Sequence, residues 1–199
     1  MTQSSLLELS QRAPIYRWIA QLLIAEVDAA GWRGLREEPV RSTLARLVPA
    51  LDRALTVDFT TEVRDAHAEE YARLFLLPNG VSPFASSWIE LEGLPERSRD
   101  ELAVLVERGF ESLGRVPNDV GAWGRVPRDH VALILDLVSQ AASRAAQSQR
   151  TEDREIAEHL DAQLVGAWIG RFARALGDGS RLPLYRALGR LLDQLNRPL

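Results

Sequence analysis

The sequence predicts an all-α fold, a single-domain helical bundle spanning residues 1–199. Apolar residues recur at three- and four-residue spacing along almost the whole chain, which is the period of helices with one buried face. Alternating runs of β-branched residues, the pattern of half-buried strands, are absent from the sequence. A length of 199 residues suits one compact domain with one core, so we expect a single cooperative body.

The first predicted helix runs from about Leu6 to Ala30. Gly31 and Gly34 are expected to end it, because glycine is favoured just after a helix C-terminus. A second helix is expected to begin at Pro39, whose fixed φ suits a first turn. The apolar stripe of the first helix comprises Tyr16, Ile19, Leu22, Leu23 and Val27, and that of the second comprises Leu44, Leu47, Val48 and Leu51.

A third helix is predicted from about Thr60 to Leu76, followed by a long loop. Two prolines and a glycine in residues 78–83 favour turns and extended chain. Ser98 and the glutamate three residues later form a capping-box pattern, which predicts a fourth helix that ends at Gly114.

Residues 116–126 contain two glycines and a proline and are predicted to form a second irregular loop. Pro127 is expected to start a fifth helix, which is apolar on most sides and should therefore be the most enclosed element. A polar segment, 147–153, separates it from a sixth helix at about 154–176. Gly177 and Gly179 then precede a seventh helix at about 182–195.

Composition excludes several classes of function. The chain has no cysteine, so disulfides, thiolate metal sites, iron–sulfur ligation and cysteine nucleophiles are ruled out. A net charge of −4 argues against binding to nucleic acid. Residues 1–11 lack the features of an export signal, and no apolar run approaches membrane-spanning length, so we expect a cytoplasmic protein without membrane insertion.

Motifs for catalysis, metals and cofactors are also missing from the sequence. None of the histidines, at positions 67, 130 and 159, lies in an HExxH or paired ExxH pattern. His67 and Glu70 share a helical face, but on a charged helix a solvated pair is the expected interpretation. Neither a phosphate-binding glycine loop nor a Gly-x-Ser-x-Gly nucleophile elbow is present. We therefore expect no enzyme activity, no catalytic residue, no metal and no cofactor.

Two clusters remain as candidates for a binding site. The first is the segment 70–75 together with 83–88, where aromatic residues and prolines gather at a helix end, and the second is 127–130. Simpler explanations exist for both. Tyr71, Leu74 and Phe75 have the spacing of core residues on a helix, and Asp129 has the charge favoured at a helix N-terminus.

Taken in order, these clusters resemble the signature segments of the TorD/DmsD/NarJ family of redox-enzyme maturation chaperones. The segments are Glu-Tyr-x-x-Leu-Phe at 70–75, Pro-aromatic-x-Ser-x-Trp at 83–88 and Pro-x-Asp-His at 127–130. The middle segment is most similar to the DmsD branch. Segments 168–172 and 183–188 also fit the family, so the resemblance extends over most of the chain. The sequence departs from the family pattern at Ile134, where many members have glutamate, and at Tyr71 and Phe84, where the DmsD branch often has tryptophan.

The resemblance implies a TorD-like fold and a non-enzymatic chaperone for a molybdopterin-dependent oxidoreductase, similar to dimethyl sulfoxide reductase. Such a chaperone binds the twin-arginine signal peptide of the precursor, holds the precursor for cofactor insertion and proofreads it before export. The oligomeric state stays open between a monomer and a domain-swapped dimer. The client enzyme itself is not identified by the sequence.

The same resemblance implies the residues of the peptide site. An apolar groove would be lined by Tyr71, Leu74, Phe75, Pro83, Phe84 and Trp88. Asp129 would pair with the peptide arginines, with Glu90 or Glu92 as further carboxylates, and His130 would hydrogen-bond the peptide or tune Asp129.

Two other functions are compatible with the residues. One is a helical scaffold that docks on a folded redox-enzyme subunit without recognising a signal peptide. The other is a helical metalloprotein that uses His67, His130 and carboxylates.

Overall fold

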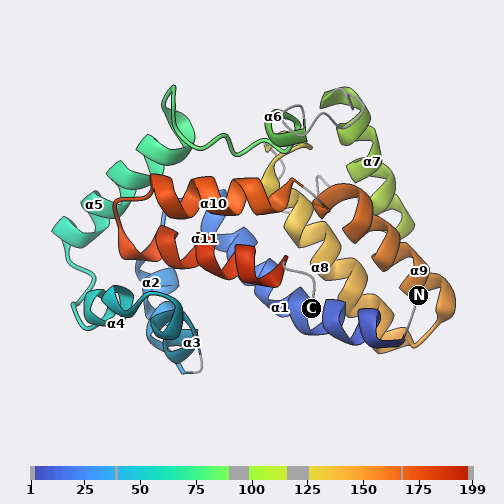
Figure 1. Ribbon diagram of the computed structural model, residues 1–199, viewed down its shortest axis with the longest axis horizontal. Helices are drawn as coiled ribbons and strands as arrows, with labels where there is room; N and C mark the ends of the chain where they lie inside the picture. The colour runs from blue at the N-terminus through green and yellow to red at the C-terminus, as the bar shows by residue number, and fades with distance from the viewer. Residues whose placement is uncertain (1–2, 39, 90–98, 116–125, 167, 197–199) are drawn as a thin grey trace. The chain divides into compact units, whose positions relative to one another are not determined.

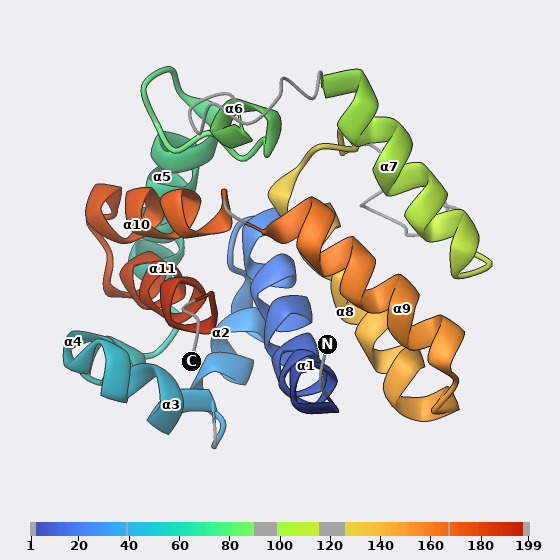
Figure 2. The ribbon, with the colours of Figure 1, turned by 45° about the vertical axis from the view of Figure 1, so that its right-hand side comes forward.

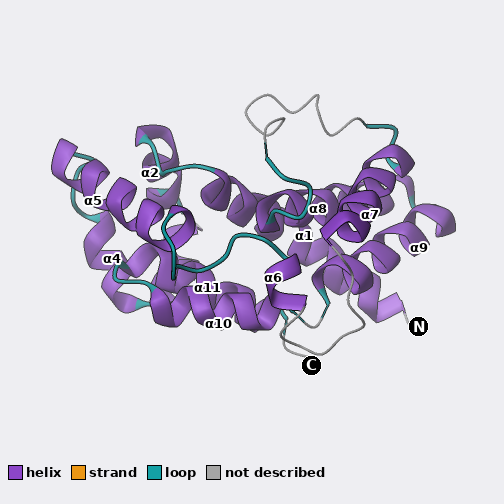
Figure 3. Cartoon of the chain, turned by 90° about the horizontal axis from the view of Figure 1, so that it is seen from above, coloured by secondary structure: helices purple, strands orange, loops and turns teal. Residues whose placement is uncertain are grey.

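A computed structural model describes residues 3–38, 40–89, 99–115, 126–166 and 168–196 of the chain. These residues form helices joined by loops and contain no β-strand, so the predicted all-α fold is confirmed (Figures 1 and 3). One isolated antiparallel bridge joins Phe84 to His130. Within the described residues, no helix is long and apolar enough to cross a membrane.

The chain folds into two compact units, and each is assembled from two segments that are distant in the sequence. The first unit comprises Met1–Ile24 and Pro83–Trp168, and the second comprises Ala25–Ser82 and Ile169–Leu199. The prediction that residues 1–199 act as one domain stays a prediction.

The first unit is organised around helix α8 (Val131–Ser148), which lies beside α1 (Gln3–Ile24), α7 (Arg99–Ser112) and α9 (Thr151–Leu160) (Figure 2). Most residues of α8 are buried, on every side of the helix, which confirms the prediction that it is the most enclosed element. A buried hydroxyl group on α8 is also satisfied, because Ser139 donates a 2.7 Å hydrogen bond to the Ala13 carbonyl on α1. The unit is completed by the short helix α6 (Ser86–Ile89) and a π-helical turn, η5 (Asp161–Val165).

The second unit contains the helices α2 (Ala29–Arg36), α3 (Val40–Leu47), α4 (Pro49–Leu55), α5 (Thr61–Tyr71), α10 (Ile169–Gly179) and α11 (Pro183–Leu195), with a π-helical turn, η1 (Ala72–Leu76). Helices α10 and α11 lie side by side, and α11 also contacts α3 and α4. Gly189 makes the close approach of α10 and α11 possible, because a Cβ atom at this position would lie 2.5 Å from the main-chain nitrogen of Gly177.

The predicted helix from 6 to 30 is wrong at its C-terminal end. Helix α1 ends at Ile24, and Asp28 adopts an extended conformation and caps α2 by accepting a 2.7 Å hydrogen bond from the Gly31 N–H. Both glycines that were expected to end the first helix lie inside α2. The capping aspartate therefore decides the boundary.

The predicted second helix is in fact two helices, α3 and α4. Val48 is extended between them, with φ −139° and ψ 91°, because the residue that precedes a proline avoids the helical conformation. Pro49 then starts α4, where its missing N–H costs nothing. The predicted start at Pro39 lies outside the described residues.

The predicted sixth helix is likewise divided. Helix α9 continues into η5 and ends at Gly166, and α10 begins as a separate helix at Ile169. Gly166 has φ +29°, and a Cβ atom there would lie 2.7 Å from the Ala162 carbonyl oxygen, so this sharp turn requires glycine. The fifth helix begins at Val131 instead of Pro127, since residues 127–130 form a turn.

The remaining predicted helices agree with the structure. The third occupies α5 and η1 and ends at Leu76 as expected, and the seventh is α11. The fourth is α7, followed by Gly114 with φ +67°. Ser98, the predicted capping residue, and most of the second predicted loop, residues 116–125, lie outside the described residues.

Candidate functional site

In the first unit, the segment after Pro83 is held against the turn that precedes α8. The Ala85 N–H donates to the Asp129 carbonyl at 2.8 Å, and the Val131 N–H donates to the Pro83 carbonyl at 2.8 Å. These two main-chain hydrogen bonds form the bridge between Phe84 and His130. The two hydrogen bonds thereby join residues that are 44 and 48 positions apart in the sequence.

The buried carboxylate of Asp129 adds a side-chain hydrogen bond to this junction. Asp129 keeps only 1% of its surface exposed, and the Ser86 hydroxyl donates a 2.7 Å hydrogen bond to its Oδ2. A carboxylate so enclosed offers almost no surface to an incoming arginine. In this structure Asp129 orients the 83–88 segment.

His130 forms the N-cap of α8. Its Nδ1 accepts a hydrogen bond from the Ala132 N–H at 3.2 Å, and the histidine has extended main-chain angles. Burial lowers the pKa of His130 to about 4, and the charge of Asp129 only partly opposes this effect. The imidazole is therefore neutral at neutral pH, as its role as hydrogen-bond acceptor requires.

Aromatic side chains at this junction remain partly accessible. Phe84 is half-buried and meets the ring of His130 edge-on, with centroids 6.0 Å apart and an interplanar angle of 85°. Pro83 and Trp88 are also half-buried, and Trp88 lies on α6. The structure thus brings Pro83, Phe84, Asp129 and His130 together, with Trp88 on the same short segment.

The other three predicted residues belong to the second unit and are buried there. Tyr71 meets Phe75 with ring centroids 5.1 Å apart, and Phe75 meets Tyr185 of α11 at 5.9 Å. Leu74 is more enclosed than either aromatic ring. This burial agrees with the simpler explanation that these residues form core at helical spacing. Their predicted role in binding a signal peptide stays a prediction.

Two leucines that directly follow this segment are exposed and were not singled out from the sequence. Leu76 is 65% and Leu77 is 58% exposed, at the end of η1. Their signal in the sequence is weak, because they continue an apolar run whose earlier members are buried. They present an apolar surface on the second unit.

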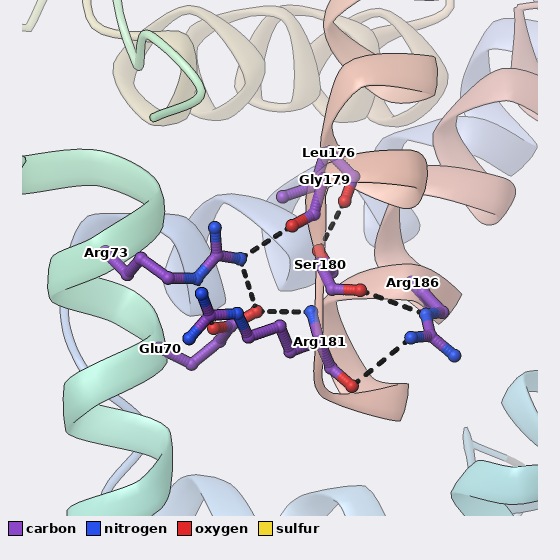
Figure 4. Close-up of polar contacts among 7 residues, drawn as sticks. All are labelled: Glu70, Arg73, Leu176, Gly179, Ser180, Arg181 and Arg186. Atoms are coloured by element: carbon purple, nitrogen blue, oxygen red, sulfur yellow. Dashed lines mark hydrogen bonds and ion pairs between the residues drawn. The ribbon is translucent and has the colours of Figure 1, made fainter. Parts of the chain in front are cut away.

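Glu70, the first residue of segment 70–75, has a structural role that was not predicted from the sequence (Figure 4). It is 4% exposed and forms a two-point ion pair with Arg73, with Nε–Oε2 and Nη2–Oε1 distances of 2.7 and 2.8 Å. Its Oε1 also accepts a 2.5 Å hydrogen bond from the Arg181 main-chain N–H, and Arg73 donates to the Gly179 carbonyl at 2.6 Å. The acidic residue of the first signature thus joins α5 and η1 to the turn between α10 and α11.

The ionisation of Glu70 reflects these contacts. Burial opposes the charged form, but the hydrogen bonds from Arg73 and from the main-chain N–H groups of Arg181 and Leu182 outweigh it and lower the pKa of Glu70. Arg186 stabilises the same turn by donating to the carbonyls of Ser180 at 3.0 Å and Arg181 at 3.4 Å.

The prediction that His67 and Glu70 form a solvated pair is wrong, since both residues are buried. The Nδ1 atom of His67 lies 2.8 Å from the Val63 carbonyl, and its ring meets Trp32 at 4.9 Å. In the part of the chain that the structure describes, no three potential metal ligands gather at one place. Glu90 and Glu92, the further candidates for binding arginine, lie outside the described residues.

Comparison with known proteins assigns the family. Residues 37–174 match the family model described as nitrate reductase delta subunit. The chain is 34% identical over 149 residues to chaperone protein TorD of Salmonella bongori, a match that covers 69% of this chain and 66% of that protein. It is 29% identical over 200 residues to chaperone protein TorD of Aeromonas salmonicida, covering 92% and 86% of the two chains. No solved structure matches the chain significantly.

The chain therefore belongs to the TorD/DmsD/NarJ family of redox-enzyme maturation chaperones. Its family and its curated relatives are chaperones, which confirms the prediction that it is not an enzyme. The nearer similarity to the DmsD branch stays a prediction.

Proposed function

We propose that this protein is a cytoplasmic chaperone that binds the twin-arginine signal peptide of a molybdoenzyme precursor. It holds the precursor, a dimethyl sulfoxide reductase-like oxidoreductase, for cofactor insertion and proofreads it before export. The observation that carries the proposal is the junction in the first unit, where two family signatures meet and leave Phe84 and Trp88 half-buried. Membership of a chaperone family supports the same conclusion.

The apolar stretch of the signal peptide binds at Pro83, Phe84 and Trp88. Aromatic and proline side chains provide rigid contact area at a low cost in conformational entropy. The main-chain bridge to His130 and the Ser86–Asp129 hydrogen bond hold these side chains in place before the peptide arrives. Asp129 and His130 act in this proposal as positioning residues.

Tyr71, Leu74 and Phe75 support a second apolar surface. Their packing fixes the end of η1, from which Leu76 and Leu77 are exposed. In this proposal Tyr71 and Phe75 contact the peptide through their small accessible edges, and Leu74 acts by packing alone.

The exposed pair Leu76 and Leu77 favours a second candidate function, docking on a folded redox-enzyme subunit without recognition of a signal peptide. A docking surface for a folded protein needs an apolar patch but does not need to distinguish arginine from other residues. The two functions therefore differ in their response to the arginine pair.

The test is the binding of fluorescent synthetic peptides, measured by anisotropy. One peptide carries an arginine pair followed by an apolar stretch, and its match carries two glutamines in place of the arginines. The proposal predicts that the arginine peptide binds more tightly and that Phe84→Ala weakens its binding by about tenfold, the effect of losing one aromatic contact in an interface. Val104→Ala, which truncates an exposed apolar residue on α7 of the same unit, is the matched control.

Equal binding of the two peptides would favour the docking function. Unchanged binding by the Phe84→Ala variant would show that the peptide contacts another surface. Co-purification from the native host, followed by mass spectrometry, identifies the precursor itself.

A further inference from the structure

The second unit contains a cavity of about 690 Å³, and Tyr71 is the lining residue that it shares with the proposed peptide site. Its walls come from the connection between α1 and α2, from the start of α5 and from Tyr71. Glu26, Asp28, Phe59 and Arg64 are among its lining residues. All of these belong to one unit, so the cavity is complete within it.

Glu26 is the lining residue whose charge is not paired within the described part of the chain. It is exposed and makes no hydrogen bond or ion pair with any residue that the structure describes. The other two charged residues of the lining, Asp28 and Arg64, already have partners. Asp28 caps α2, and Arg64 pairs with Asp65 at 2.9 Å. An incoming charged group therefore meets one free carboxylate.

The aromatic walls are held rigidly beside this carboxylate. Phe59 packs against Trp32 with ring centroids 5.7 Å apart, and Tyr71 packs against Phe75. Burial raises the pKa of Tyr71 and of Tyr185, and the negative charge of Glu26 adds to the effect at both phenols. Tyr185 is fully buried and its hydroxyl has no hydrogen-bond partner among the described residues. The negative charge of Glu26 therefore acts on Tyr71 in the cavity wall and on the buried Tyr185.

An anion is a poorer occupant, although α2 and α5 both begin at this cavity. The N-terminus of each helix is already capped by a side chain, since Asp28 accepts from the Gly31 N–H and Thr60 from the Val63 N–H. An anion would also meet the charges of Glu26 and Asp28. Arginine suits the cavity better, because its apolar stem and flat cationic end match aromatic walls next to a carboxylate.

The burial of Asp129 leaves the arginines of a signal peptide without the partner expected from the sequence. We infer that the cavity between the α1–α2 connection and the start of α5 receives an arginine side chain of the signal peptide, whose guanidinium group pairs with Glu26 between Phe59 and Tyr71. This inference rests on the proposed function, and every lining residue of the cavity belongs to the second unit.

The test uses the full chain and the synthetic peptide with an arginine pair, together with two versions in which either arginine is replaced by glutamine. Glu26→Gln removes the charge and keeps the shape of the side chain. It is expected to weaken binding of the arginine-pair peptide by about tenfold, as the loss of one charge-assisted hydrogen bond does. Glu69→Gln, an equal change of charge at an exposed position on α5 outside the cavity wall, is the matched control and should bind normally.

The inference further predicts coupling between Glu26 and one particular arginine of the peptide. In the Glu26→Gln variant, replacing that arginine by glutamine should cause no further loss, whereas in the unaltered protein it should cost about tenfold. Ala29→Phe fills the cavity without changing the charge, and it should weaken binding of the arginine-pair peptide as well. Circular dichroism and thermal unfolding check that each variant is folded.

The outcomes separate this inference from the proposed function. If the unaltered protein prefers the arginine pair and Glu26→Gln keeps that preference in full, the cavity is not the arginine subsite, but signal-peptide recognition stands. If the unaltered protein does not distinguish arginine from glutamine, both the proposed recognition and the subsite are wrong.

Discussion

The carboxylate of Glu70 accepts a 2.5 Å hydrogen bond from the main-chain N–H of Arg181, 111 residues further along the chain. Through this contact and its ion pair with Arg73, a residue of the first signature stabilises the turn between α10 and α11. The second unit is built from two distant segments, and this network is one of the places where they are joined.

Replacement of Glu70 by alanine is expected to lower the free energy of unfolding by about 3 kcal/mol. The change leaves the half-buried Arg73 guanidinium and the Arg181 N–H without their carboxylate partner, and breaking a buried ion pair is costly for that reason. Urea denaturation measures the effect. Asp65→Ala breaks the exposed pair with Arg64 and should cost less than about 0.5 kcal/mol. Equal losses in the two variants would contradict a structural role for the Glu70 network.

His130 is expected to make the protein less stable in mild acid. Its pKa is about 4 in the folded protein, below the ordinary value of 6.5, so the unfolded chain binds a proton more readily between these two pH values. Stability from this group is complete above pH 6.5 and is lost as the pH falls toward 4, by about 3 kcal/mol at most. Denaturation at a series of pH values measures this loss.

The matched variant is His130→Asn, which keeps a good helix N-cap but has no group that titrates in this range. Its stability should fall less than that of the unaltered protein between pH 6.5 and 4. Parallel curves for the two proteins would mean that His130 is not the group responsible.

Two glycine substitutions are predicted to have opposite effects. A methyl group at Gly189 would lie 2.5 Å from Gly177 N and 2.6 Å from Ala173 O, both main-chain atoms that cannot move without separating α10 from α11. Gly189→Ala should therefore destabilise the protein by about 1–3 kcal/mol despite the better helix propensity of alanine. At Gly34, inside α2, a methyl group would meet nothing within 4 Å, and Gly34→Ala should stabilise the protein by roughly 0.5–1 kcal/mol. Thermal unfolding of the pair checks both signs.

Ser86→Ala tests the junction in the first unit. It removes the 2.7 Å hydrogen bond to the buried Asp129 carboxylate, and leaving a buried charge short of a donor should cost about 1–3 kcal/mol. Ser112→Ala removes a hydroxyl that donates to the Gly109 carbonyl at the end of α7, and it should cost less than about 0.5 kcal/mol. Because the Ser86 bond holds the segment that carries Phe84, we also expect weaker binding of the arginine-pair peptide. Normal stability and binding in Ser86→Ala would show that the main-chain bridge alone suffices.

The extents of α5 with η1 and of α11 were predictable because local signals agree with the final structure at these places. Thr60 caps α5 and Pro183 opens α11, and both residues act through their own neighbours in the chain. The division between α1 and α2 was predicted wrongly for a related reason. Gly31 and Gly34 have a strong average preference for helix ends, but the capping bond of Asp28 overrides it.

The candidate site was predictable only in part. Its position at segments 70–75, 83–88 and 127–130 came from a resemblance in sequence, and the structure does join 83–86 to 129–131. The roles of individual side chains were not predictable. Asp129 and Glu70 have the charges expected of binding residues, yet both are buried and bonded within the protein.

Helical periodicity and the order of short motifs were sufficient, by themselves, to determine that this chain is all-α and belongs to a chaperone family. These features depend on residues that are close together in the chain. Only the tertiary structure decided which polar groups are accessible, because burial and hydrogen bonding depend on contacts between distant segments. That is why Asp129 proved to be buried and hydrogen-bonded to Ser86, while Glu26, which no motif contains, is exposed and lines a cavity.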